Sequence, residues 1–307
     1  MRSLLPLLLA LTLACEVPPE NKLAVDNDGD GVTEFEGDCD DGDASVGICW
    51  LTVSTGGSHT CGVTGAGSVE CWGWDGKGQS TPPSGTFESV SAGSVHTCGV
   101  TSTGSVECWG DDSDGQSSPP SGTFESVSAG DFHTCGVMST GSVECWGWDG
   151  EGQSTPPSGT FESVSAGAIH TCGVTSMGSV ECWSDDSFGQ SSPPAGIFES
   201  VSAGWWHTCG VTSTGSVECW GHDSVGQSSS PSGTFESVSA RMEHTCGVTS
   251  TGSVECWGRN EYGESTPPVG AFESVSVGYL HICGVTSTGS VECWGRDTEG
   301  QSTPPEL

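Results

Sequence analysis

The sequence predicts an all-β protein in which seven equal units close into a ring. A fifteen-residue phrase, HTCGVTSTGSVECWG at residues 96–110, recurs seven times with small changes. Units of 37 residues fill positions 49–307 with no remainder. Such a fixed period indicates one supersecondary unit per repeat. Because neither end of the array carries an atypical capping unit, a closed ring is favoured over an open solenoid.

Each phrase predicts a β-hairpin. The runs around Val100 and Val106 flank a short polar turn that ends in Gly104, which is typical of a hairpin loop. If Thr101 pairs with Ser105 across a three-residue loop, Gly104 adopts the left-handed conformation. In that register Val100 faces Val106.

The same register predicts a disulfide within every repeat. It places Cys98 opposite Cys108 at a non-hydrogen-bonded position, where antiparallel strands come closest. A two-residue loop would instead set Glu107 opposite Cys98. We therefore expect the bridges Cys61–Cys71, Cys98–Cys108, Cys135–Cys145, Cys172–Cys182, Cys209–Cys219, Cys246–Cys256 and Cys283–Cys293.

Composition limits both the partners and the source of stability. The chain has six Lys plus Arg against 40 Asp plus Glu, a net charge of -34. This balance argues against nucleic acid, because phosphate contacts need basic side chains. It fits a soluble exterior, a cation-binding segment or a salty habitat. Only 33% of the residues are hydrophobic, so part of the stability must come from a source other than apolar burial. We expect each hairpin disulfide to add roughly 2 to 3 kcal/mol to the free energy of unfolding.

Residues 1–14 predict a signal peptide. Arg2 precedes an apolar run that is too short to span a membrane. The ending LTLAC resembles a bacterial lipobox, which implies lipidation at Cys15 and a tether over residues 15–25. We expect an exported protein of the bacterial cell envelope or outer surface, whose membrane contact is made only through this anchor. An ordinary signal peptide and a secreted chain are the alternative.

The remaining cysteines agree with export. Cys39 and Cys49 form one further candidate pair, so no thiol is left over among the 17 cysteines. Zinc is disfavoured because the repeat cysteines lie ten residues apart and no CxxC motif occurs.

Residues 26–47 predict a calcium-binding segment. Its opening DNDGDG matches an EF-hand-type loop, in which carboxylates converge on a hard cation. Gly37 stands where that loop has a bidentate Glu, so later carboxylates would complete the site. The segment resembles Asp-rich repeats of secreted bacterial proteins and thrombospondin type 3 repeats. A solvated acidic linker is the alternative. The candidate ligands are Asp26, Asp28, Asp30, Glu34, Asp38, Asp40, Asp41 and Asp43.

The 37-residue unit resembles the RCC1 repeat family. The stretch SAGSVHTCGVTSTGSVECWGDDSDGQ at residues 91–116 carries its AG and His before one strand, its turn, its Trp-Gly and its Gly-Gln. The resemblance implies a seven-bladed β-propeller over residues 49–307, each blade a small antiparallel sheet. The short cysteine-bearing copies are similar to secreted bacterial members, among them a β-lactamase-inhibitor propeller.

The repeated polar residues predict structure rather than catalysis. One histidine recurs before each first cysteine, and a residue present in every blade is most simply a structural hydrogen-bonding group. A metal or proton site would require all seven imidazoles to point inward together. Trp109 and its equivalents are expected to pack between blades, and Glu107 to be solvated. No Ser-His-Asp set, phosphate loop or paired-carboxylate cleft is visible, so we expect no enzyme.

Two segments differ between repeats, and we interpret them as a binding surface. The first variable segment is the two residues before each repeated His, and the second is the four residues between Trp-Gly and Gly-Gln. Trp, Tyr and Arg, which dominate binding hot spots, concentrate there. Neutral drift in tolerant loops is the alternative. The candidate partner-binding residues are Trp74, Phe132, Trp148, Ile169, Phe188, Trp205, Trp206, Met242, Arg259, Tyr262 and Tyr279.

These observations predict a monomeric, exported binding scaffold whose propeller loops recognise a protein or a glycan. A structural, calcium-dependent cell-surface component without a discrete partner is the second hypothesis. Guanine-nucleotide exchange, by analogy with eukaryotic RCC1, is the third, and export from the cytosol argues against it.

Overall fold

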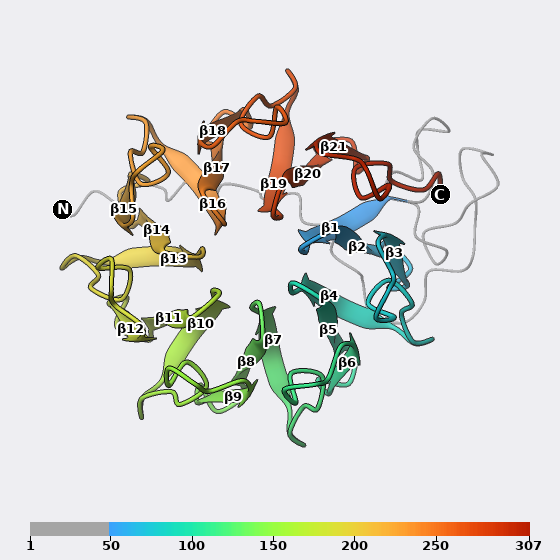
Figure 1. Ribbon diagram of the computed structural model, residues 1–307, viewed down its shortest axis with the longest axis horizontal. Helices are drawn as coiled ribbons and strands as arrows, with labels where there is room; N and C mark the ends of the chain where they lie inside the picture. Colours follow the sequence, from blue (N-terminus) through green and yellow to red (C-terminus); the bar gives the residue numbers. More distant parts are fainter. Residues whose placement is uncertain (1–48) are drawn as a thin grey trace, which may run out of the picture.

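The computed structural model describes residues 49–307, which form a ring of seven three-stranded antiparallel sheets (Figure 1). The first strands of the blades are β1 (Trp50–Thr55), β4 (Phe87–Ala92), β7 (Phe124–Ala129), β10 (Phe161–Ala166), β13 (Phe198–Ala203), β16 (Phe235–Arg241) and β19 (Phe272–Val277). The second strands are β2 (His59–Thr64), β5 (His96–Thr101), β8 (His133–Met138), β11 (His170–Thr175), β14 (His207–Thr212), β17 (His244–Thr249) and β20 (His281–Thr286). The third strands are β3 (Val69–Gly73), β6 (Val106–Gly110), β9 (Val143–Gly147), β12 (Val180–Ser184), β15 (Val217–Gly221), β18 (Val254–Gly258) and β21 (Val291–Gly295).

The predicted seven-bladed, all-β architecture is thus confirmed. Within residues 49–307 no helix is long and apolar enough to cross a bilayer. The predicted signal peptide, the lipidation site Cys15, the tether and the acidic segment with its candidate calcium ligands lie outside the described residues.

The hairpin register is the predicted one. The Thr101 N–H donates to the Ser105 carbonyl at 2.8 Å, and Gly104 has a φ of 80°. Cys98 then lies opposite Cys108, with their Cα atoms 4.0 Å apart. This close approach is what a non-hydrogen-bonded antiparallel pair provides.

All seven repeat disulfides form as expected, each within one hairpin at a sequence separation of 10. No bridge among these fourteen cysteines joins two blades. Cys49 is buried and disulfide-bonded, and its predicted partner Cys39 lies outside the described residues.

The hydrophobic core is divided into seven parts, and each part lies between two blades. At the first junction Cys61 and Val63 of one blade pack against Phe87 and Trp109 of the next. The rings of Phe87 and Trp109 meet edge to face at 6.1 Å, a favoured aromatic geometry. The predicted packing of the repeated Trp between blades is confirmed, so the apolar stability of each blade depends on its neighbours.

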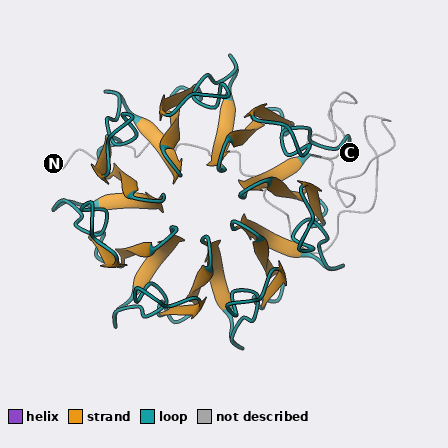
Figure 2. Ribbon diagram, viewed as in Figure 1, coloured by secondary structure: helices purple, strands orange, loops and turns teal. Residues whose placement is uncertain are grey.

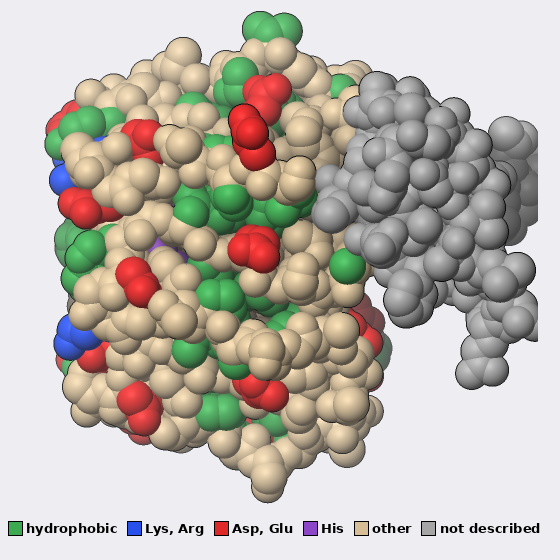
Figure 3. Space-filling view, turned by 90° about the vertical axis from the view of Figure 1, so that its right-hand side faces the viewer, with side chains coloured by type: hydrophobic (Ala, Val, Ile, Leu, Met, Phe, Trp, Pro, Cys, Tyr) green, Lys and Arg blue, Asp and Glu red, His purple; other side chains and the backbone are tan. Residues whose placement is uncertain are grey.

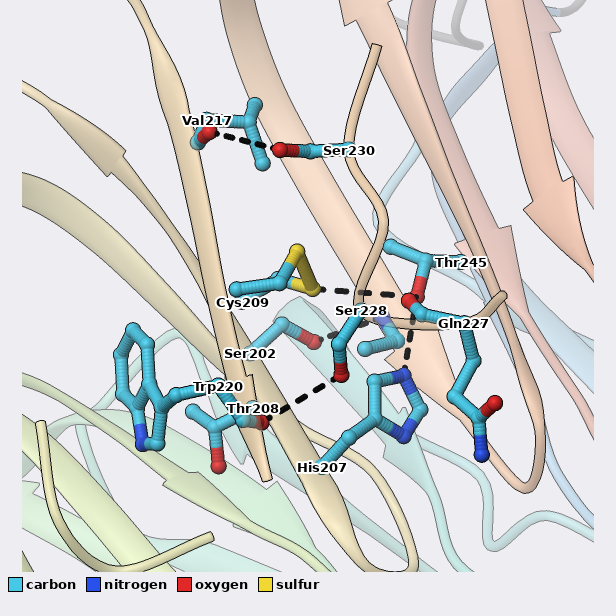
Figure 4. The surroundings of a disulfide bond; sticks show 12 residues. Ser202, His207, Thr208, Cys209, Val217, Trp220, Gln227, Ser228, Ser230 and Thr245 are labelled. Carbon is cyan, nitrogen blue, oxygen red and sulfur yellow. Dashed lines mark hydrogen bonds between the residues drawn. A yellow bond between two sulfur atoms is a disulfide. The ribbon is translucent and has the colours of Figure 1, made fainter. Parts of the chain in front are cut away.

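Polar side chains bind the same junctions together. Trp109 Nε1 donates to the Gln79 carbonyl at 2.9 Å, and Thr97 Oγ1 donates to it at 3.1 Å. His59 Nε2 lies 2.8 Å from Thr97 Oγ1. Because the Thr97 hydroxyl proton is already donated to the carbonyl, His59 donates from Nε2 and its Nδ1 is unprotonated. Figure 4 shows the equivalent arrangement around Cys209, with His207 pointing at Thr245.

The histidines are therefore structural, as predicted. Burial, followed by the charge of His281, lowers the pKa of His59 from 6.5 to about 3. The one exception to the hydrogen-bond pattern is His244: its Nε2 is buried without a partner, because Ile282 stands where other blades have Thr.

The ring closes without a shared strand. β1 pairs with β2 of its own blade, and the last and first blades meet through the contacts that join the blades at every junction except that of His244. Trp72 Nε1 and Thr60 Oγ1 both donate to the Gln301 carbonyl at 2.9 Å. Thr55 N–H donates to Ser276 Oγ of β19 at 3.0 Å. The junction between the last and first blades is therefore formed by β19 and by the C-terminal turn that contains Gln301.

Candidate functional site

The two variable segments of each repeat lie side by side. The first residue of the second segment donates its N–H to the carbonyl of the last residue of the first segment: Trp148 to Phe132 at 2.9 Å, and His222 to Trp206 at 2.7 Å. The first strands point with their C-terminal ends toward the centre of the ring (Figure 2), so the first segments surround the central mouth. We call the surface formed by all fourteen segments the variable face.

The basic side chains of the described residues gather on this face. In the side view of Figure 3 the visible Lys and Arg side chains lie along the left-hand edge of the disc. Lys77, Arg241, Arg259 and Arg296, the only basic residues of positions 49–307, all belong to or adjoin the variable segments.

Blades four and five form an aromatic cluster on the variable face. Phe188, 49% exposed, contacts the His222 ring at 4.8 Å and the Trp206 ring at 5.8 Å. Trp206 in turn meets Trp205 edge to face at 5.3 Å. These contacts bring together three of the candidate partner-binding residues, Phe188, Trp205 and Trp206, with His222, which was not among the candidates.

Trp205 also belongs to a second arrangement, whose contacts cross the central mouth between distant blades. The Trp205 ring packs on the Tyr279 ring, with 5.4 Å between the ring centres. The Arg241 guanidinium lies over the Tyr279 ring, 5.4 Å from the ring centre. Tyr279 Oη donates to Ser94 Oγ at 2.8 Å. Arg241 Nη2 binds Asp131 Oδ1 at 3.1 Å. We call Ser94, Asp131, Trp205, Arg241 and Tyr279 the central plug.

The charges of the central plug are buried. The Asp131 and Arg241 side chains are 5% and 12% exposed, and Arg241 Nη1 donates to the Ala92 carbonyl at 3.1 Å. Burial raises the pKa of the Asp131 carboxyl, and the charge of Arg241 opposes that rise. Burial and the Asp131 charge likewise raise the pKa of Tyr279. The plug joins blades two, three, five, six and seven.

The backbone of blade six is remodelled to aim Arg241 across the mouth. Six repeats have Gly at this position, whereas Arg241 pairs with His244 as an extra rung of the sheet. Met242, a candidate binding residue, then takes a left-handed φ of 47°. The sequence itself marks Arg241 as exceptional, because SAR replaces SAG in one copy only.

One position of the second variable segment is structural rather than free to vary. Asp75 accepts from the Ser80 N–H at 2.7 Å and from Thr81 Oγ1 at 2.8 Å, and this turn recurs with Asp or Asn in every repeat. The prediction that all four residues vary freely is therefore too broad. The first, third and fourth positions are the variable ones.

In the second variable segment, the residue at the third position depends on the residue at the first position. Where the segment begins with Trp, Gly follows two residues later: a Cβ on Gly76 would lie 2.3 Å from the Trp74 ring, and one on Gly150 would lie 2.4 Å from the Trp148 ring. The indoles thus lie flat against these glycines. Phe132, 42% exposed, meets Trp148 edge to face at 6.3 Å.

Arg259 is held within its own blade. It binds Glu261, and lies 3.5 Å from Glu243 and 4.0 Å from the fully buried Glu264. Glu264 replaces the Gln of the other repeats, so Arg259 neutralises a carboxylate that the other blades do not have.

Ile169, another candidate partner-binding residue, is half-buried.

Within positions 49–307 no group of three or more His, Cys, Asp or Glu side chains is arranged to hold a metal ion. The variable face offers exposed aromatic rings and carboxylates for contact with a partner.

Comparison with known proteins identifies the repeats. The Regulator of chromosome condensation (RCC1) repeat model matches residues 87–116, 124–153, 198–227, 243–264 and 272–301. No curated protein matches the chain.

Solved structures show the same fold. The ectodomain of the Physcomitrella patens receptor kinase CR4 is 25% identical, with a TM-score of 0.70 over 81% of this chain and 74% of that one. The ectodomain of the Arabidopsis thaliana receptor kinase ACR4 is 27% identical, with a TM-score of 0.68 over 81% of this chain and 98% of that one. Prp20p of Saccharomyces cerevisiae is 16% identical, with a TM-score of 0.63 over 72% of this chain and 74% of that one. The chain belongs to the RCC1-repeat proteins, and its described part is an RCC1-like seven-bladed β-propeller.

Proposed function

We propose that this protein is an exported, non-catalytic scaffold that binds a protein partner through the variable face. The observation that carries the proposal is the grouping of both variable segments of every repeat on one surface, around an aromatic cluster of Phe188, Trp206 and His222. A framework that repeats almost without change, and that presents different side chains at equivalent loops, suits a binding function.

The comparisons support this class of function. RCC1-repeat propellers are generally non-catalytic scaffolds, and the neighbours include receptor-kinase ectodomains and a protein whose described binding properties concern Gsp1p and histones. Seven disulfides, together with ectodomain neighbours, support export, because such bridges persist in oxidising compartments. Attachment by lipid at Cys15 to a bacterial envelope is part of the proposal.

A crosslinking capture tests the proposal. The purified protein is incubated with intact cells or secreted material from its source, crosslinked, and compared with a variant in which Phe188 and Trp206 are both Ser. Ser is a suitable replacement for Trp206 because the first repeat carries Ser58 at that position, and Phe188 is an exposed loop residue. We expect a protein that is captured by the unmodified chain and lost, or reduced about tenfold or more, with the variant, as hot-spot truncations do.

Capture that is equal for both chains would overturn the use of this face. Capture of only oligosaccharide would replace the protein partner by a glycan, and no capture together with calcium-dependent self-association would favour the structural hypothesis. Thermal melting of the variant, expected to be close to that of the unmodified chain, excludes misfolding as the cause of a lost signal.

A further inference from the structure

The outer part of the variable face is a ring of contacts between successive blades. At three junctions a side chain of one second segment contacts a side chain of the next second segment, and each time the fourth residue of one segment meets the first residue of the next. Lys77 Nζ binds Asp111 at 2.8 Å, Phe188 meets His222 at 4.8 Å, and Tyr262 lies 5.8 Å from the Arg296 guanidinium. Because the same 37-residue unit recurs at every junction, we expect these two positions to lie side by side at the other four junctions as well.

Two of the recorded junctions hold a cation of this chain. Lys77 is paired with a carboxylate, and Arg296 lies against an aromatic ring. Both a carboxylate and an aromatic face attract a cationic side chain, the second through the ring quadrupole.

Two other junctions carry both a carboxylate and an aromatic ring, and neither position is a Lys or Arg of this protein. By the repeat, exposed Asp114 precedes Trp148 at one junction, and exposed Glu299 precedes Trp74 at the other. Each pairs an indole with a carboxylate. Within positions 49–307 every basic side chain is already engaged elsewhere, as described above, so none can serve these two junctions.

A buried hydrogen-bond donor is also unused in the same two repeats. The Nε2 of Gln116 donates to Asp111 at 3.1 Å, and that of Gln227 pairs with His222 at 2.9 Å, so this amide reaches the first-position side chain. In the two Trp repeats the indole cannot accept from it, and the Nε2 atoms of Gln79 and Gln153 are buried without a partner. An accepting group such as a main-chain carbonyl is the complementary chemistry.

From these observations we infer that the variable face binds a basic protein segment, whose Lys or Arg side chains occupy the junctions Asp114–Trp148 and Glu299–Trp74. This inference rests on the proposed function and names the chemistry of its partner. The negative charge of the whole chain, with 40 acidic against six basic residues, steers a cationic partner toward the protein and repels anionic glycans, nucleic acids and phosphorylated peptides.

The test uses a fluorescein-labelled peptide of alternating Lys and Gly, and the same peptide with every Lys acetylated, measured by anisotropy at low and high salt. Acetylation removes the charge and retains the backbone. The double variant Asp114→Asn, Glu299→Gln is compared with Glu107→Gln, Glu292→Gln, which removes the same charge from exposed strand positions of the same two blades.

A second pair of substitutions separates local recognition from general electrostatics. Trp74→Asp with Trp148→Asp removes both indoles and adds two negative charges, and Asp already occupies this position in the repeats of Asp111 and Asp185. Attraction by net charge alone predicts tighter binding of the Lys peptide. Recognition by the indole and carboxylate together predicts weaker binding.

We expect the Lys peptide to bind and the acetylated one not to bind. The Asp114, Glu299 double variant and the Trp74, Trp148 double variant should each weaken binding about fivefold to tenfold, and the strand control less than about twofold. Equal weakening by both charge variants, tighter binding after the Trp substitutions, or no binding of the Lys peptide would overturn the inference. If a protein with an acidic binding segment is captured through the variable face, the proposed function stands and this inference falls.

Discussion

The buried ion pair of the central plug gives the sharpest test of the structure. Arg241→Gly restores the residue that the other six repeats carry, and Asp131→Ala introduces the residue found at Ala168. The first change alone leaves the Asp131 carboxylate 5% exposed without its cation. Removing one partner of a buried pair costs about 3 to 5 kcal/mol, whereas replacing both by residues that fit is close to neutral.

We therefore expect Arg241→Gly to lower the free energy of unfolding by about 3 to 5 kcal/mol and the double variant to lower it by about 1 kcal/mol or less. For a domain of this size the single change should lower the melting temperature by about 2 to 4 °C per kcal/mol. Urea and thermal unfolding with the disulfides intact, followed by circular dichroism, measure both quantities.

The pH dependence supplies an independent check. Burial raises the pKa of Asp131, and loss of Arg241 should raise it further. A carboxyl whose pKa is raised on folding destabilises the folded protein when it is ionised, so the deficit of Arg241→Gly should shrink as the pH falls through that raised pKa. A deficit below about 1 kcal/mol, or a double variant as unstable as the single one, would show that water reaches the pair and that it is not buried as described.

Four further expectations follow from other features. Thr171→Val should cost about 1 to 3 kcal/mol in urea unfolding, because it leaves His133 Nε2 without its partner; an unchanged midpoint would refute the junction hydrogen bond. Replacing Cys98 and Cys108 together by Ala should cost roughly 2 to 3 kcal/mol, and non-reducing peptide maps should show the other six bridges intact. The buried histidines, with pKa values lowered from 6.5 to about 3, or about 4 for one of them, should make stability fall as the pH decreases from about 6.5 toward 3, and a flat profile over that range would contradict their burial. Calorimetry on the intact protein should detect chelator-reversible calcium binding that is lost when the Asp residues of 26–43 are replaced by Asn, and no binding at millimolar calcium would leave an acidic linker.

The sequence predicted those parts of the fold that repeat. The spacing of Cys98 and Cys108 indicated the hairpin register, because side chains alternate across a strand and a three-residue loop, unlike a two-residue loop, sets the two cysteines opposite each other. The recurrence of one His and one Trp in every copy correctly indicated structural roles, since contacts between identical neighbours must be identical.

What the sequence did not predict are contacts between residues that differ from copy to copy and lie far apart in the chain. Arg241 and Asp131 are 110 positions apart, and no local pattern pairs them across the centre of the ring. The contacts of His222 with Phe188 and Trp206 likewise depend on how the loop of one blade packs on the loop of the next. The constant Asp of the second variable segment was visible in the sequence, but its role required the geometry of the turn.

Ring closure without strand exchange has a consequence for the order of the chain. Each blade is made from one contiguous stretch, and the junction between Gln301 and the first blade uses the same contacts as five of the six covalently continuous junctions, the sixth lacking the Thr hydroxyl because of Ile282. The linear order of the polypeptide therefore adds little to the folded ring, and a circular permutant that joins residue 307 to residue 49 and opens any other exposed TPPSG-type loop retains every junction. The blade that comes first in the sequence can therefore change without changing which blades contact each other in the folded propeller.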